Sequence, residues 1–186
     1  MNEDFIKRID DLANSDLWGD RSAEISALIA RIAVDESTLR SLVERYLESK
    51  SKSVIRSLAF LFARFCQVPG KISGSEFIYM IRGLGRSDDP ETLISCLDAT
   101  SVFSARFSEP IQGVDVFLNS CLGFRGRLET LVLNTTLEVI DDLLSRKQLS
   151  LLFSSNEISR LRERLRIILQ SEDISGVLVP VELKRL

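Results

Sequence analysis

Apolar residues recur every three to four positions through almost every segment of the chain, which is the period of an amphipathic α-helix. The strict alternation of apolar and polar residues that marks a half-buried strand is nearly absent outside the last eleven residues, 176–186. The sequence therefore predicts an all-α protein with a short C-terminal segment. That segment is either an added strand or an extended tail packed across the last helices.

Turn-forming residues divide the helical pattern into about nine helices. Proline cannot continue a helix and glycine suits its C-terminal cap, so Val68-Pro69-Gly70 predicts a stop. Pro90 and Pro110 suit first helical turns. The expected helices cover about residues 5–12, 22–32, 35–47, 53–67, 75–84, 90–97, 110–121, 128–145 and 157–170. Short turns between them predict antiparallel hairpins.

Two of the expected helices carry too many apolar residues for a single buried face. The helix at 53–67 has a broad stripe that needs neighbours on more than one side. The helix at 128–145 is apolar on most of its circumference, from Leu131 to Leu144, so we expect it to be buried between others.

A weak internal repeat accompanies this pattern. Residues 39–42, 55–58 and 81–84 share a branched apolar residue, an arginine, a small residue and a leucine, at unequal spacings of 16 and 26. The run IRGLGRSDDPETLISCLDA at 81–99 resembles the junction between two HEAT-like repeats, in which one helix ends in Leu-Gly and the next begins at Asp-Pro. The resemblance implies stacked antiparallel helical hairpins in one domain, 1–186, forming either a regular solenoid or an irregular right-handed array. Such folds commonly hold another macromolecule on their broad exposed surface.

Composition removes most catalytic chemistries. The 186 residues include no histidine, which excludes Ser-His-Asp, Cys-His and His-metal sites. The sequence has no phosphate-binding loop, no dinucleotide glycine fingerprint and no nucleophile elbow. Its three cysteines are scattered and read as reduced core thiols. We therefore expect a protein that is not an enzyme and needs no cofactor or metal.

The ends and hydropathy of the chain bear on its location. Its first residues lack the basic stretch and apolar run of a secretion signal. No window approaches the roughly 18 uncharged apolar residues of a membrane span. We expect a cytoplasmic protein that makes no membrane contact.

Negative charge is concentrated at the N-terminus. The chain has 24 basic and 27 acidic residues, a net charge of −3, which argues against a protein that coats nucleic acid through bulk charge. Residues 1–24 contain seven acidic and three basic residues, a net charge of −4, so the other 162 sum to +1. The candidate partner-binding residues here are Asp10, Asp11, Asp16, Trp18, Asp20 and Glu24. Trp18 either pins the first helix to the core or, if exposed, serves as an interface anchor.

Two further acidic groups were candidates for a site. Glu138, Asp141 and Asp142 lie at i, i+3 and i+4 of one helix, which makes them a solvated face or a docking patch for a basic partner. The run at 88–91 offers three carboxylates for a metal or for acid–base work. Acidic residues at a helix start also stabilise the helix dipole, and we favour this structural role for 88–91.

The expected last helix carries Arg160, Arg162, Arg164 and Arg166. They fall into two pairs that flank an apolar arc, which fits side chains lying along the edge of the core better than one basic stripe for nucleic acid.

These observations predict a non-enzymatic protein-binding module. Its small size, acidity and lack of catalytic motifs are typical of bacterial immunity proteins and inhibitors, which cover the basic active site of a nuclease-type toxin with an acidic surface. The alternatives are a helical-repeat nucleic-acid-binding protein, an enzyme acting on bases among them, and an adaptor or homo-oligomer.

Overall fold

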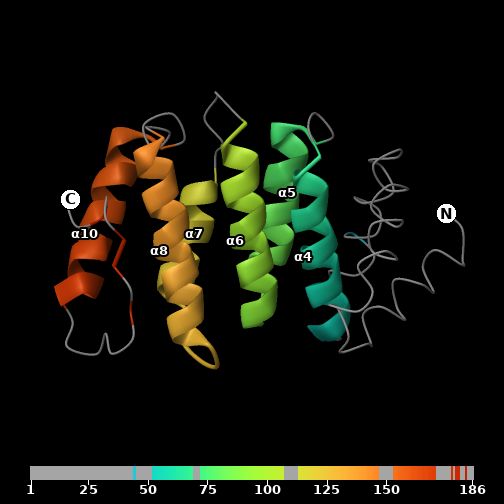
Figure 1. Cartoon of the computed structure of the whole chain (residues 1–186), viewed down its shortest axis with the longest axis horizontal. Coiled ribbons are helices and arrows are strands. Elements are labelled where there is room, and N and C mark those ends of the chain that lie inside the picture. Colours follow the sequence, from blue (N-terminus) through green and yellow to red (C-terminus); the bar gives the residue numbers. More distant parts are fainter. Residues whose placement is uncertain are drawn as a thin grey trace, which may run out of the picture. The chain divides into compact units, whose positions relative to one another are not determined.

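The computed structural model describes residues 44, 52–68, 72–106, 113–146, 153–170, 177, 179–180 and 183. Six α-helices run through these ranges, and no strand occurs within them (Figure 1). The helices are α4 (Lys52–Cys66), α5 (Gly74–Leu84), α6 (Pro90–Ser104), α7 (Val114–Leu122), α8 (Glu129–Ser145) and α10 (Ser155–Gln170). The all-α class is confirmed for this part of the chain.

The three helices expected within residues 5–47 lie outside the described residues, apart from Glu44, which is helical. The count of about nine helices and the HEAT-like repeat therefore stay predictions.

Most helix boundaries follow from local capping. Ser73 caps α5 by accepting a hydrogen bond from the Glu76 amide, and the Glu76 side chain accepts one from the Ser73 amide in return. Gly85 ends the same helix, and its amide donates to the Ile81 carbonyl. Pro90 is the first residue of α6, as its missing amide hydrogen favours. These starts and stops agree with the sequence to within one residue.

The start of α7 differs from the sequence prediction. Pro110 lies outside the described residues, and the helix begins only at Val114. The residue before it, Gly113, has φ = 96°, a left-handed conformation that glycine adopts without strain and that a continuous helix cannot contain. The glycine therefore sets this boundary.

The chain divides into two compact units, Met1–Ala99 and Thr100–Leu186, and the boundary falls inside α6. The expectation of one domain over 1–186 stays a prediction.

Aromatic packing joins α4 and α5 in the first unit. Phe62 and Phe77 are fully buried, and their ring centroids lie 5.6 Å apart. The buried residues of α4 are Ser57, Leu58, Ala59, Leu61, Phe62, Ala63, Phe65 and Cys66. They occupy most of the circumference of the helix, which confirms the broad buried surface predicted for 53–67.

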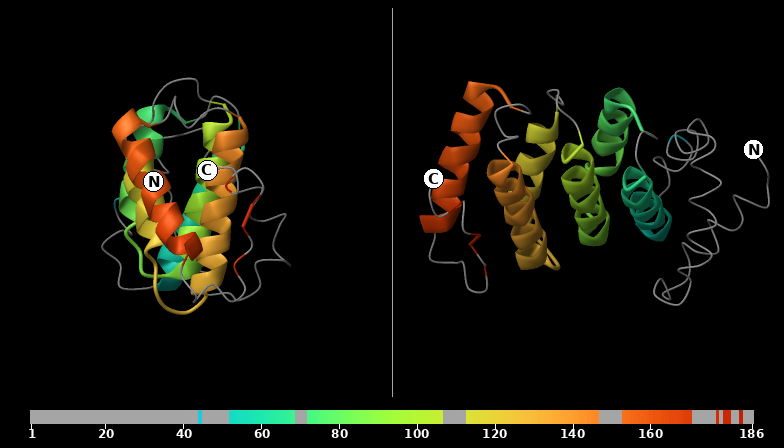
Figure 2. Two further views of the ribbon diagram at one scale, coloured as in Figure 1. Left: turned by 90° about the vertical axis from the view of Figure 1, so that its left-hand side faces the viewer. Right: turned by 45° about the horizontal axis from the view of Figure 1, so that its top comes forward.

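In the second unit α7 packs against both α8 and α10, and the side-by-side placement of α7 and α8 is clear in Figures 1 and 2. The buried residues of α8 are Val132, Thr136, Leu137, Val139, Ile140 and Leu143. Leu131 is 48% exposed, so its predicted place in the core is wrong. It precedes Val132 by one residue, which turns its side chain about 100° away from the buried stripe.

The C-terminal segment is described at four positions, 177, 179, 180 and 183, and none of them is in a strand. Leu183 is buried, and its amide donates a hydrogen bond of 3.0 Å to Asp141 Oδ1 on α8. Of the two alternatives from the sequence, this contact favours an extended tail that packs on α8.

The aromatic contact gives a test of the first unit. We expect Phe77→Ala to lower the free energy of unfolding by about 3–5 kcal/mol, because it removes a fully buried ring and leaves a cavity beside Phe62. Urea denaturation measures the change. Val116→Ala is the control, since that side chain is 67% exposed and its loss should change stability by less than about 0.5 kcal/mol. Equal midpoints for the two variants would contradict the assigned core.

Candidate functional site

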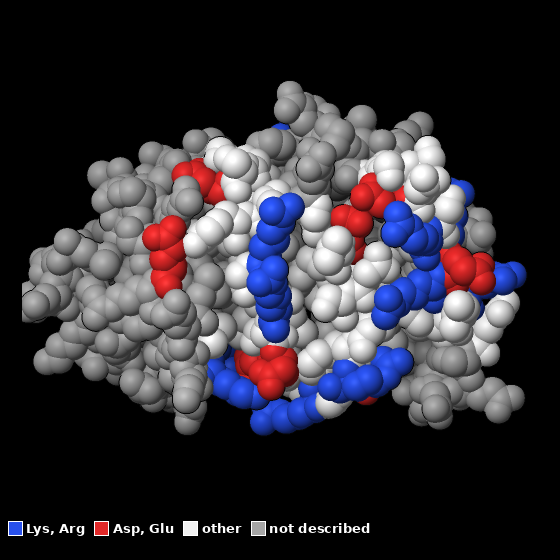
Figure 3. Space-filling model, turned by 180° about the vertical axis from the view of Figure 1, so that it is seen from behind, with Lys and Arg blue, Asp and Glu red and all other residues white. Residues whose placement is uncertain are grey.

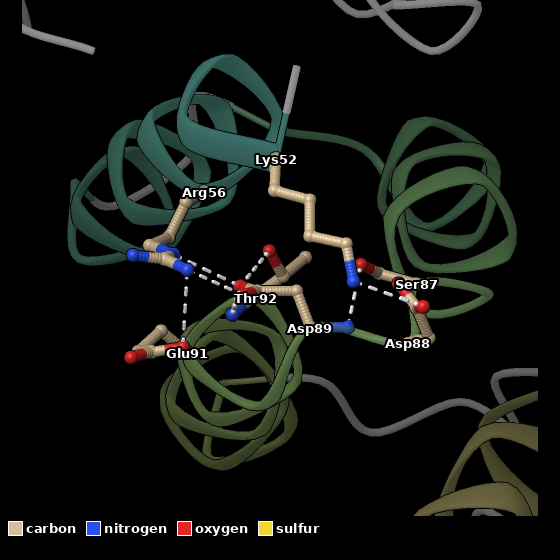
Figure 4. A network of polar contacts seen from close by, with 7 residues as sticks. All are labelled: Lys52, Arg56, Ser87, Asp88, Asp89, Glu91 and Thr92. Atoms are coloured by element: carbon tan, nitrogen blue, oxygen red, sulfur yellow. Dashed lines mark hydrogen bonds and ion pairs between the residues drawn. The ribbon is translucent and has the colours of Figure 1, made fainter. Parts of the chain in front are cut away.

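The acidic run at the start of α6 forms a polar network with α4 (Figure 4). Asp89 is only 3% exposed. Arg56 of α4 donates two hydrogen bonds to its carboxylate, from Nε to Oδ2 at 3.1 Å and from Nη2 to Oδ1 at 2.6 Å. The same guanidinium lies 3.4 Å from Glu91 Oε2. One arginine thus interacts with two of the three carboxylates at 88–91.

Asp89 also caps α6. Its Oδ2 accepts hydrogen bonds from the backbone amide and from the hydroxyl of Thr92, each 2.9 Å long. The amide of Asp89 in turn donates to Ser87 Oγ at 3.1 Å. The third carboxylate, Asp88, pairs with Lys52 at 3.0 Å on the exposed side of the network. These contacts satisfy an orphan amide of the helix start, which is the structural role favoured from the sequence.

The electrostatics of Asp89 support that role. Burial on its own raises the pKa of this carboxyl, but the hydrogen bonds from Arg56 and Thr92 and the charge of Arg56 together hold the pKa below its ordinary value. A carboxylate held ionised and shared among these donors is suited to anchoring α6. It is poorly suited to moving a proton near neutral pH.

The acidic triad on α8 does not act as one surface. Asp142 pairs with Arg146 at 2.9 Å and accepts a hydrogen bond from Ser101 Oγ at 3.1 Å. Asp141 accepts the amide of Leu183 at 3.0 Å. Glu138 is exposed. Two of the three candidates therefore hold structure within the second unit, and Glu138 is the one whose side chain projects into solvent.

The other candidate partner-binding residues, Asp10, Asp11, Asp16, Trp18, Asp20 and Glu24, lie outside the described residues.

The arginines of α10 are all exposed. The apolar arc between their two pairs is buried at Leu161 and Leu165, as the helical pattern predicts. Figure 3 shows basic side chains gathered over α10. Arg166 pairs with Glu163 at 2.9 Å. The guanidinium of Arg164 lies next to Gly123, at the C-terminal end of α7. A Cβ built on this glycine would lie only 2.5 Å from Arg164 Nη2. A cation at this position is favoured by the dipole of α7.

The loop from α7 to α8 holds a feature that the sequence pattern did not reveal. Leu128 has φ = 60°, the only non-glycine residue with positive φ in the described ranges, and it is 39% exposed. This left-handed conformation costs a residue with a Cβ about 1–2 kcal/mol. The sequence did predict a turn between the helices at 110–121 and 128–145. A leucine in a position that suits glycine or asparagine cannot be recognised from hydropathy.

The three thiols lie in the described part of the chain, where all are buried and none forms a disulfide. Burial raises the pKa of Cys121 to about 12, although a hydrogen bond with Thr136 acts in the opposite direction. A thiol that stays protonated at neutral pH is a poor nucleophile. The prediction of core thiols is confirmed.

The described ranges contain no candidate metal cluster and no helix that could span a membrane. Their cysteine and acidic side chains do not gather into a group of three or more that could hold a metal ion. None of the helices described there combines the length and apolarity needed to cross a bilayer.

Comparison with known proteins gives no relative: no family model, curated protein or solved structure matches the chain.

The Asp89 network makes stability depend on pH. A carboxyl whose pKa is lowered by folding contributes stability above its unfolded pKa, about 3.9, and loses it as the pH falls through the folded pKa. We expect Asp89→Asn to lower the free energy of unfolding by about 1–3 kcal/mol at pH 7, because the charge-assisted bonds to Arg56 weaken. The deficit should shrink towards pH 3. Urea denaturation across this range measures it.

Asp88→Asn is the matched control for this experiment. Asp88 is 81% exposed and pairs with the exposed Lys52, so its loss should change stability by less than about 0.5 kcal/mol. A difference between Asp89→Asn and the wild type that stayed constant from pH 7 to pH 3 would show that the charge of Asp89 is not what stabilises α6.

Proposed function

We propose that this protein is a non-enzymatic protein-binding module of the bacterial cytoplasm, built from HEAT-like or irregularly stacked helical hairpins. Its specific role in this proposal is that of an immunity protein or inhibitor. It neutralises a basic, nuclease-type toxin by covering the toxin's active site.

One observation carries the proposal. Most candidate groups in the described ranges have a structural use: Asp89 anchors α6, Asp142 pairs with Arg146, and Cys121 is buried and protonated, whereas Glu138 is exposed. The packed helices hold the exposed side chains in fixed positions. A protein of this kind acts through the shape and charge of its exterior.

Charge supports a basic partner. The strongest concentration of negative charge in the sequence is the −4 carried by residues 1–24, and Glu138 adds an exposed acid on α8. Opposite charge accelerates the encounter with a cationic nuclease and opposes binding to nucleic acid. In this proposal Trp18 is a buried anchor of the complex, since aromatic residues dominate many interfaces.

The exposure of the α10 arginines favours a second candidate, a helical nucleic-acid-binding protein. All four guanidinium groups are accessible, and phosphate contacts come most often from such side chains. A salt titration separates the two functions. Binding of RNA or DNA through these arginines would weaken linearly on a log–log plot, whereas a toxin inhibitor should show no affinity for nucleic acid.

Rescue of toxin-arrested cells tests the proposed function. The chain is co-expressed with a panel of nuclease-type toxin domains, including any encoded by a neighbouring gene, and colonies are counted. We expect protection against one toxin. Reversal of Asp10, Asp16 and Asp20 to lysine should weaken that protection by about tenfold or more, because charge steering and anchoring are lost.

Two further variants test which surface of the protein contacts the toxin. Glu138→Lys reverses an exposed charge on α8, and Glu163→Lys makes the same change on a different helix, α10. The first should weaken protection and the second should not. Protection that none of these changes alters would show that the assigned acids do not face the toxin. Turnover of a substrate by the purified chain would contradict the function itself.

A further inference from the structure

Basic and exposed apolar side chains occur together in the loop after α7 and the first turn of α8, and α10 adds others beside the start of that loop. We call this set the loop patch and define it by Arg125, Arg127, Leu128, Leu131, Arg164 and Ile167. The position of Arg164 beside Gly123 brings α10 to the start of this loop. Figure 3 shows basic side chains both over α10 and along the adjoining lower edge.

Three apolar side chains of the loop patch are open to solvent. Leu128 is 39% exposed, Leu131 is 48% exposed and Ile167 is 59% exposed. Leu128 and Leu131 lie three residues apart at the start of α8, and Ile167 lies one turn beyond Arg164 on α10. Three of the four large hydrophobic residues exposed in the described ranges thus belong to this patch.

The backbone at Leu128 argues that this exposure has a use. Glycine or asparagine would adopt φ = 60° at little cost, yet the position holds a leucine whose side chain reaches solvent. Strain of this kind persists where the surrounding structure enforces it, and it is concentrated at functional positions. The leucine gives up stability to present an apolar group next to Arg127.

Charge identifies the kind of partner that fits. The patch presents three arginines, of which Arg125 pairs with Glu129 at 3.0 Å with its own side chain 69% exposed. Arginine together with exposed aliphatic groups is typical of protein interfaces, whereas a phosphate backbone has no use for the aliphatic part. The complementary partner is an acidic segment with a stripe of apolar residues.

The chain itself contains such a segment. Residues 1–24 carry a net charge of −4 and place Phe5, Ile6, Ile9 and Leu12 at helical spacing. We infer that the loop patch binds residues 1–24 of a second copy, which joins molecules head to tail. An interface between two different surfaces of the same chain leaves one of each surface free at the ends, so longer assemblies form as concentration rises. The inference uses residues 1–24, which the proposed function also assigns to the toxin, but its test is separate because association is measured on the purified chain alone.

Sedimentation of the full-length protein tests it. We expect the average mass to rise with concentration at about 50 mM salt and to return towards that of a monomer at about 0.5 M salt, since screening weakens the charged contact. A synthetic peptide of residues 1–24, added in excess, should also return the protein to monomer by occupying the patch.

Leu128→Asn separates a binding role from a structural one. Asparagine tolerates the left-handed conformation, so the thermal midpoint should stay close to that of the wild type while association weakens about tenfold or more. Arg125→Ser with Arg127→Ser should weaken association similarly. Arg82→Ser with Arg86→Ser is the control, because it removes two exposed arginines from the first unit.

Three results would overturn the inference. The first is a chain that stays monomeric at low salt at every concentration. The second is a Leu128→Asn variant that associates as strongly as the wild type. The third is a monomer that takes up a short single-stranded RNA through Arg125 and Arg127, which would assign the patch to nucleic acid.

Discussion

The contact between Arg56 and Asp89 is the constraint on which the described part of the first unit depends most. A carboxylate that is 3% exposed must be fully satisfied, and it is satisfied here by a guanidinium from α4 and by donors in the first turn of α6. The apolar faces of these helices would tolerate some sliding. The bidentate bond does not, because two donor atoms must meet two acceptor atoms at once.

The structural roles of these acidic groups bear directly on the function of the protein. Asp89, which the sequence offered for catalysis, caps α6. On α8, Asp141 binds the Leu183 amide and Asp142 pairs with Arg146. Glu138 and the arginines and leucines of the loop patch are among the side chains that stay exposed. Function is therefore proposed for surfaces of opposite charge. The acidic residues 1–24 bind a toxin or the loop patch of a second copy, and the loop patch is basic and apolar.

Local chemistry explains why much of the fold could be predicted. The end of α5 before Gly85 and the start of α6 at Pro90 depend on local residue types and were predicted to within one residue, whereas the Ser73 cap itself was not identified. The bond from Leu183 to Asp141 joins residues 42 apart, and no local pattern encodes it. Leu128 was missed for another reason, since its conformation opposes its residue type. The sequence identified the acidic candidates but not which of them the fold would occupy.

A double-mutant cycle at Arg56 and Asp89 tests most directly the claim that the acidic run serves structure. Arg56→Gln, Asp89→Asn and the double variant are compared with the wild type by urea denaturation at pH 7, and the coupling energy is the non-additive part. The account predicts a coupling of about 1.5 kcal/mol or more, because each side chain loses its partner in either single variant. A coupling below about 0.3 kcal/mol would contradict it and would return Asp89 to the list of groups available for chemistry.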